Sequence, residues 1–115
     1  MADQEQQELP DWRAAMISDL RGPDITAATR ALLALTYNDP DRTAVEVLLL
    51  CQLSSSDVDP EVRALAVTCM GHVGRIHRAV SPETVRRLEA LIDDAELGGR
   101  AEDALGDIAA FGAVN

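Results

Sequence analysis

The residues from Asp59 to His77 read DPEVRALAVTCMGHVGRIH, and this stretch decides the fold of the chain. Asp59 suits a helix N-cap, and Pro60 suits the first helical position, where its missing amide proton costs no hydrogen bond. Apolar residues then recur at the three- and four-residue spacing of one helical face. The stretch therefore predicts an amphipathic helix with a single buried stripe. That stripe consists of Val62, Leu65, Ala66, Cys69, Met70, Val73 and Ile76.

Five prolines divide the rest of the chain into further helices. Each proline is followed directly by an acidic residue, which is typical of the first turn of a helix. Asp39, Asp59 and Ser81 stand in front of three of these prolines and are strong capping residues. The pattern predicts helices over about residues 10–20, 23–36, 40–53, 60–77, 82–93 and, after Gly98-Gly99, 100–111.

The composition favours an all-α protein of one domain. The chain has 115 residues, of which 47% are apolar but only 3% aromatic, and Ala and Leu are strong helix formers. We expect residues 1–9 to form a flexible acidic tail and residues 10–115 to form the domain. The helix over residues 40–53 has almost no polar side, so we expect it in the middle of the stack.

The predicted helices repeat. Residues 66–76 can be laid over residues 101–111 with an offset of 35, so that Gly71 meets Gly106, and residues 66–73 can be laid over residues 28–35 with an offset of 38. Matching periods of this length indicate stacked helix pairs, here three of them. Gly71 and Gly74 lie in the interior of the helix predicted over residues 60–77. They indicate either close packing against a neighbouring helix or a bare backbone surface left for a partner.

The run DPEVR at residues 59–63, with Ala66 and CMGHV at residues 69–73, resembles the second helix of a HEAT repeat. The resemblance implies a short right-handed α-solenoid of about three HEAT-like helix pairs, six helices in all. It also implies a role in binding, with the second helices lining the concave side. A closer resemblance is to the small acidic HEAT-type immunity proteins of bacterial polymorphic toxin systems. It is carried by ALLALTYNDP at 31–40, CMGHVGRIH at 69–77 and RAEDALGDI at 100–108.

The charge of the chain restricts its partners. Twenty acidic residues against ten basic ones give a formal net charge of −10. Such a surface repels phosphate, so we expect no direct binding of nucleic acid, whereas basic proteins are attracted. The start of the chain has no basic and apolar pattern of a secretory signal, and no apolar run is long enough for a bilayer. We expect a cytoplasmic protein without a membrane partner.

No pattern of catalytic or metal-binding residues occurs. We interpret Cys51 and Cys69 as small buried hydrophobes rather than as a disulfide or metal ligands. His72 and His77 are five residues apart and do not share a helical face. Cys69 and His72 have a spacing that a nucleophile and its base can use, but Cys69 lies on the buried stripe and no orienting group accompanies it. We therefore expect no enzyme activity, no cofactor and no metal.

The candidate site is a protein-binding surface. Asp103 and Asp107 share one helical face, which Arg100 can partly neutralise; a solvated face and a binding surface both explain such a set. Tyr37 is a large aromatic residue in a turn between repeats, of the type that anchors interfaces. His72 and Arg75 lie off the buried stripe. The candidate partner-binding residues are Tyr37, Asp39, His72, Arg75, Glu102, Asp103 and Asp107.

The resemblance implies an immunity protein that neutralises a basic toxin domain, such as a nuclease, by covering its active or substrate-binding surface. Two alternatives come from other classes. A general HEAT-repeat adaptor would have no single dedicated target. A bilin-lyase-like HEAT protein would be longer and would need a pocket-forming insertion, which this sequence does not contain.

Overall fold

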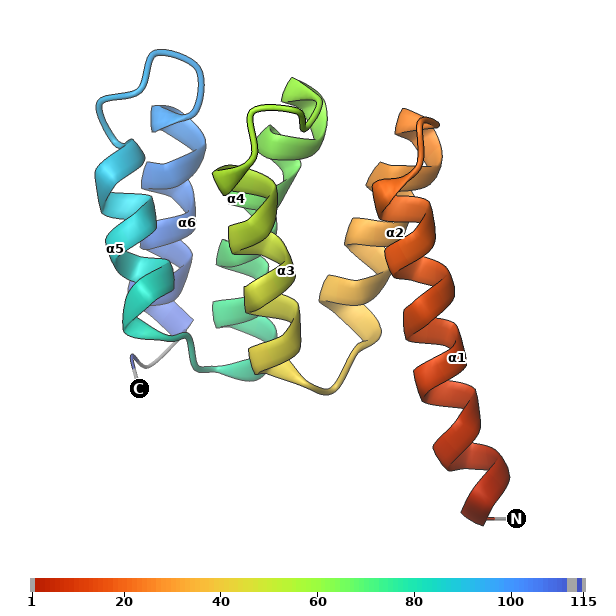
Figure 1. Cartoon of the computed structure of the whole chain (residues 1–115). Coiled ribbons are helices and arrows are strands. Elements are labelled where there is room, and N and C mark those ends of the chain that lie inside the picture. The colour runs from red at the N-terminus through yellow and green to blue at the C-terminus, as the bar shows by residue number, and fades with distance from the viewer. Residues whose placement is uncertain (1, 112–113, 115) are drawn as a thin grey trace.

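The computed structural model describes the backbone of residues 2–111 and 114, and the side chains of residues 8–111 and 114. Its helices pair antiparallel as α1–α2, α3–α4 and α5–α6, and the three pairs stand in a row (Figure 1). The prediction of an all-α fold is therefore confirmed. The bounds are α1 (Ala2–Arg21), α2 (Ile25–Asn38), α3 (Arg42–Ser54), α4 (Pro60–His77), α5 (Pro82–Leu91) and α6 (Gly98–Phe111).

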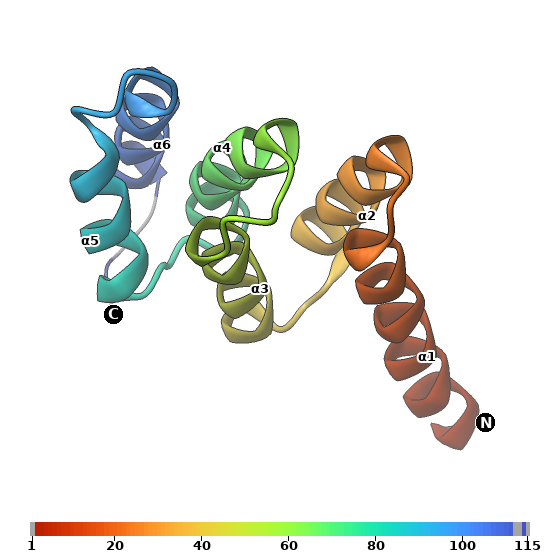
Figure 2. The ribbon, with the colours of Figure 1, turned by 45° about the horizontal axis from the view of Figure 1, so that its top comes forward.

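The helices form two layers (Figure 2). The second helices of the pairs, α2, α4 and α6, pack side by side, and α4 in the middle contacts both of the others. The first helices lie in the other layer, where each packs on the second helix of its own pair and makes few contacts with its neighbours in that layer. The array is therefore thin, with principal extents of 48 × 33 × 17 Å.

The prediction that the helix over residues 40–53 lies in the middle of the stack is confirmed, because α3 belongs to the middle pair and stands between α1 and α5 in its layer (Figure 2), but the expected burial from several directions is wrong. One side of α3 buries Val45, Leu49 and Leu53, but Val47 is 54% exposed and Cys51 is exposed. The reason is that α3 stands in the outer layer and lacks a close neighbour on the side of α1. The interpretation of Cys51 as a buried hydrophobe is wrong for the same reason.

Cys69 is buried between helices, as predicted. Burial raises the pKa of its thiol to about 11, although a hydrogen bond with Thr36 acts in the opposite direction. The thiolate is the nucleophilic form of cysteine. Cys69 is therefore an inert core residue.

Gly71 and Gly74 let α4 and α6 approach closely. A Cβ atom at Gly71 would lie 2.9 Å from the Cα atom of Ala104, and one at Gly74 would lie 2.8 Å from Cγ1 of Ile108. Both distances are shorter than real side chains tolerate, so any larger residue would push the helices apart. Both glycines are also buried. The close-packing interpretation is confirmed, and the backbone here is not a bare surface for a partner.

The proline–acid pairs act in two ways. Asp59 and Ser81 cap α4 and α5, with the proline as the first helical residue, as predicted. In α2 and α3 the acid after the proline is itself the cap: Asp24 accepts the amide proton of Ala27, and Asp41 accepts that of Ala44. These two helices therefore begin two residues later than the sequence pattern predicts.

The first helix begins at Ala2 rather than at Pro10, so the predicted boundary between a tail and the helix is wrong for the backbone of residues 2–9. A proline inside a helix removes one hydrogen bond, here to the carbonyl group of Gln6, and its ring crowds the same carbonyl, which together cost about 3 kcal/mol. The Glu, Gln and Leu residues before it are good helix formers, which favours continuation. The other ends of the predicted segments, Met1, Gly112, Ala113 and Asn115, lie outside the described residues.

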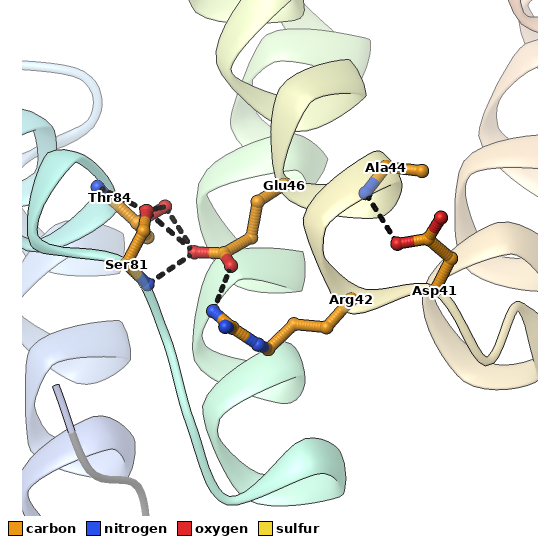
Figure 3. A network of polar contacts seen from close by, with 6 residues as sticks. All are labelled: Asp41, Arg42, Ala44, Glu46, Ser81 and Thr84. Atoms are coloured by element: carbon orange, nitrogen blue, oxygen red, sulfur yellow. Dashed lines mark hydrogen bonds and ion pairs between the residues drawn. The ribbon is translucent and has the colours of Figure 1, made fainter. Parts of the chain in front are cut away.

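Glu46 joins the second pair to the third. Its side chain is buried in α3, where Oε1 accepts hydrogen bonds from the Ser81 amide at 2.8 Å and from the Thr84 hydroxyl at 2.6 Å (Figure 3). The Ser81 hydroxyl adds a third bond at 3.1 Å, and Arg42 forms an ion pair with Oε2. The carboxylate thus ties α3 to the first turn of α5, 35 to 38 residues later.

Candidate protein-binding surface

Three of the candidate residues meet on the layer of second helices. The rings of Tyr37 on α2 and His72 on α4 lie 5.4 Å apart between centroids, at an angle of 37°. Nη2 of Arg75 lies 2.8 Å from Nδ1 of His72 and 3.5 Å from the Tyr37 hydroxyl. Tyr37 is 47% exposed and Arg75 is also exposed. The array brings them together because α2 and α4 are neighbours that run in the same direction.

The surroundings of His72 favour its neutral form. Partial burial lowers its pKa, the nearby charge of Arg75 lowers it further, and the carboxylate of Asp107 acts in the opposite direction. Neutral His72 accepts the Arg75 hydrogen bond at Nδ1, which leaves its proton on Nε2. Arg75 keeps further N–H groups for a partner, and Tyr and Arg are the residue types most often responsible for interface affinity.

Asp103 and Asp107 line a shallow hollow beside this cluster. The hollow has a volume of about 490 Å³ and lies between α4 and α6. Arg100 is the only cation among the described residues that line the hollow, and it donates to the Thr68 hydroxyl at 2.9 Å. Among the described side chains there are two ion pairs, and neither includes Asp103 or Asp107. Both carboxylates are therefore available to a basic partner.

Glu102 points elsewhere. It is exposed, but it does not line the hollow, and five residues along a helix correspond to about 140° of rotation from Asp107. With the offset of 35, Glu102 matches Val67, which is fully buried on the α4 face that carries Gly71. Since no described helix follows α6, the same position there is open, and a charged residue suits the outer face of a terminal repeat. Glu102 is therefore better assigned to the end of the stack than to the partner surface.

Asp39 is a structural residue. Only 1% of it is exposed, and both of its oxygens accept hydrogen bonds from Arg13, at 2.6 and 2.7 Å. It also accepts the amide proton of Asp41 at 2.9 Å. The carboxylate thus ties α1 to the turn between α2 and α3. Its prediction as a partner-binding residue fails because the side chain is already occupied by residues of its own chain.

Because of the Arg13–Asp39 ion pair, we expect the folding stability to fall in acid. Desolvation alone would raise the pKa of Asp39, but the hydrogen bonds from Arg13 and Asp41 outweigh it and lower this pKa below its ordinary value of 3.8. The contribution of the Asp39 carboxylate to folding stability is therefore fully present above pH 3.8. It is lost as the pH falls through the lowered pKa of the folded state. The difference in Tm between the wild type and Asp39→Asn should narrow from about pH 6 to about pH 2. A constant difference in calorimetric Tm would contradict this assignment.

One edge of the array carries a concentration of negative charge that was not predicted from the sequence. The loops that join the helices within each pair all lie at the upper edge of Figure 1. Residues 19–24, 57–63 and 93–97, at these loops, contain eight carboxylates and two arginines, whereas residues 39–42 and 75–83 at the opposite edge contain three of each. Alternate loops of a helix-hairpin row share an edge. Assigning each acid to an odd or even loop would therefore have revealed this edge.

Other kinds of site find less support in the described part of the chain. Its His, Cys, Asp and Glu side chains include no group of three or more that could hold a metal ion. None of its helices combines the length and apolarity that a membrane crossing needs.

The comparisons with known proteins add no relative. No protein-family model matches the chain, and neither does any curated protein or solved structure. The resemblance to HEAT repeats and to immunity proteins therefore stays a prediction. What stands on the structure itself is an all-α array of three helix pairs.

Proposed function

We propose that this protein binds another protein and catalyses no reaction, and that it acts as the immunity partner of a basic bacterial toxin domain. The observation that carries the proposal is the meeting of Tyr37, His72, Arg75 and Asp107, from three helices, on one surface. Asp107 belongs to this group because its negative charge acts to raise the pKa of His72. Its Oδ2 atom also lies 3.2 Å from the point that a Cβ atom at Gly71 would occupy. A cytoplasmic location belongs to the same proposal.

The chemistry of the surface suits a basic partner. Asp103 and Asp107 carry negative charge without an ion pair among the described side chains. They can therefore compete for the Lys and Arg residues with which a nuclease holds phosphate. Tyr37 supplies an exposed apolar ring beside them. The net charge of −10 raises the rate of encounter with a cationic domain, and added salt should slow it.

The proposal is tested with a toxin-type C-terminal domain encoded beside the gene of this protein. Asp103→Lys combined with Asp107→Lys should weaken the complex by about tenfold or more relative to Glu83→Lys combined with Glu89→Lys. The second pair lies exposed on α5 and changes the net charge by the same amount. Affinity is measured by titration calorimetry, and protection by survival of cells that produce both proteins.

Two results would count against the proposal. Equal affinities of the two folded double variants would show that the acidic part of this surface does not bind the partner. Failure of the wild-type protein either to bind the neighbouring domain or to protect cells would overturn the immunity role.

A further inference from the structure

A groove lies between the first and second helix pairs. It has a volume of about 550 Å³ and is bounded by the α1–α2 loop and the α3–α4 loop. It is open because α2 and α4 pack closely while α1 and α3 make few contacts, so the two pairs diverge on the outer side. Its lining includes the apolar residues Leu20, Ile25, Ala28, Leu48, Val58 and Val62.

The groove opens at the acidic edge described above. Asp57 and Asp59 line it, and Arg21 is the only cation that the described part of the chain adds to the lining. Three of the eight carboxylates at this edge serve as helix caps or bind loop amides, namely Asp24, Asp59 and Asp94. The other five have no capping role and no ion pair among the described side chains, and all are exposed. They are Asp19, Asp57, Glu61, Asp93 and Glu96.

We propose that this groove docks a basic amphipathic segment of a partner protein. One large apolar side chain of the segment enters the apolar lining, and Lys or Arg residues on either side of it lie over the carboxylates of the rim. Charge complementarity selects this occupant, because the two loop segments that bound the groove, residues 19–24 and 57–63, carry five carboxylates against two arginines. The inference rests on the proposed function only in requiring a basic protein partner. The groove shares no lining residue with the surface around Tyr37.

Cys51 reports on the occupancy of the groove. Its side chain is exposed and lines the groove, whereas Cys69 is buried and its thiol has a pKa raised to about 11. A thiol reagent therefore modifies Cys51 first. A segment seated in the groove covers Cys51 and slows the modification.

The test uses an acetylated helical peptide of Leu and Lys, with the Leu residues on one face, and the uncharged reagent N-ethylmaleimide. At a peptide concentration ten times the dissociation constant, Cys51 should react about tenfold more slowly, because the free fraction falls in that proportion. A peptide with Ser in place of Leu has the same charge, and one with Glu in place of Lys has the same apolar face. Both should leave the rate unchanged.

Two matched triple variants distinguish binding in the groove from nonspecific electrostatic attraction of the peptide. Asp19→Lys, Asp57→Lys and Glu61→Lys together remove rim charges without touching a cap, and they should abolish protection of Cys51. Asp11→Lys, Glu83→Lys and Glu89→Lys change the net charge equally at exposed sites outside the groove and should preserve it. Peptide binding without protection of Cys51, or equal loss in both triple variants, would overturn the inference.

The partner domain gives an independent readout. If the toxin-type domain binds and Cys51 still reacts at its free rate, the groove inference is wrong while the proposed function stands. If the domain protects Cys51 and the Asp103 and Asp107 reversal has no effect, the groove is the docking site and the surface on α6 is not.

Discussion

Glu46→Ala should lower the free energy of unfolding by about 3–5 kcal/mol, the usual cost of removing one partner from a buried ion pair. Glu46 is 3% exposed, and its carboxylate accepts three hydrogen bonds from Ser81 and Thr84 besides the ion pair with Arg42. Its removal leaves the Ser81 amide without this acceptor and the Arg42 charge without its partner. Urea unfolding followed by circular dichroism measures the loss.

A graded control is Glu46→Gln. The amide oxygen can still accept from Ser81 and Thr84, but the charge opposite Arg42 is gone, so the loss should be smaller than for Glu46→Ala. Equal losses in the two variants would show that the ion pair, and not the bonds to α5, provides the stabilisation. A loss below about 1 kcal/mol for Glu46→Ala would contradict the structural role altogether.

Leu49→Ala should cost about 2–5 kcal/mol, as a large-to-small change of a fully buried side chain. Leu49 lies on the side of α3 that faces the core. Val47→Ala, two residues earlier on the same helix, removes an apolar side chain that is mostly exposed, and it should change stability by no more than about 0.5 kcal/mol. Similar losses from the two changes would mean that α3 is buried on both sides.

The sequence predicted the helices well because the signals that form them are local. Asp59 with Pro60, and Ser81 with Pro82, sit within one turn of the amides they cap, so their effect does not depend on the rest of the chain. The same local rule failed at Pro10. There the pattern marks a helix start, but favourable residues on both sides carry the helix through the proline.

Burial was predicted less well, because it depends on neighbours. The apolar residues of α3 indicate a helix surrounded on all sides, yet Val47 and Cys51 are exposed because α1 diverges from α3. The same divergence creates the groove. No periodicity along the chain records the separation of two outer helices, so this feature follows only from how the pairs stack.

The residues of the candidate surface were selected one by one from the sequence, His72 and Arg75 as residues off the buried stripe and Tyr37 as a large aromatic residue. Their contact with one another follows from the packing of α2 against α4. Asp39 was also selected from the sequence as a partner-binding residue, but Arg13, 26 residues earlier, donates hydrogen bonds to its carboxylate.

The sequence by itself determined the helical fold and its three-pair repeat. Caps and apolar periodicity act over three or four residues, and the apolar helical pattern recurs in each of the three helix pairs. The tertiary structure alone decided which polar groups are occupied and which are available. Glu46 meets Ser81 across 35 residues and is satisfied, whereas five carboxylates of the loop edge are exposed and have no ion pair among the described side chains. The physical reason is that a polar group is satisfied by whatever lies within hydrogen-bond distance of it, and for these groups that depends on helix packing rather than on sequence neighbours.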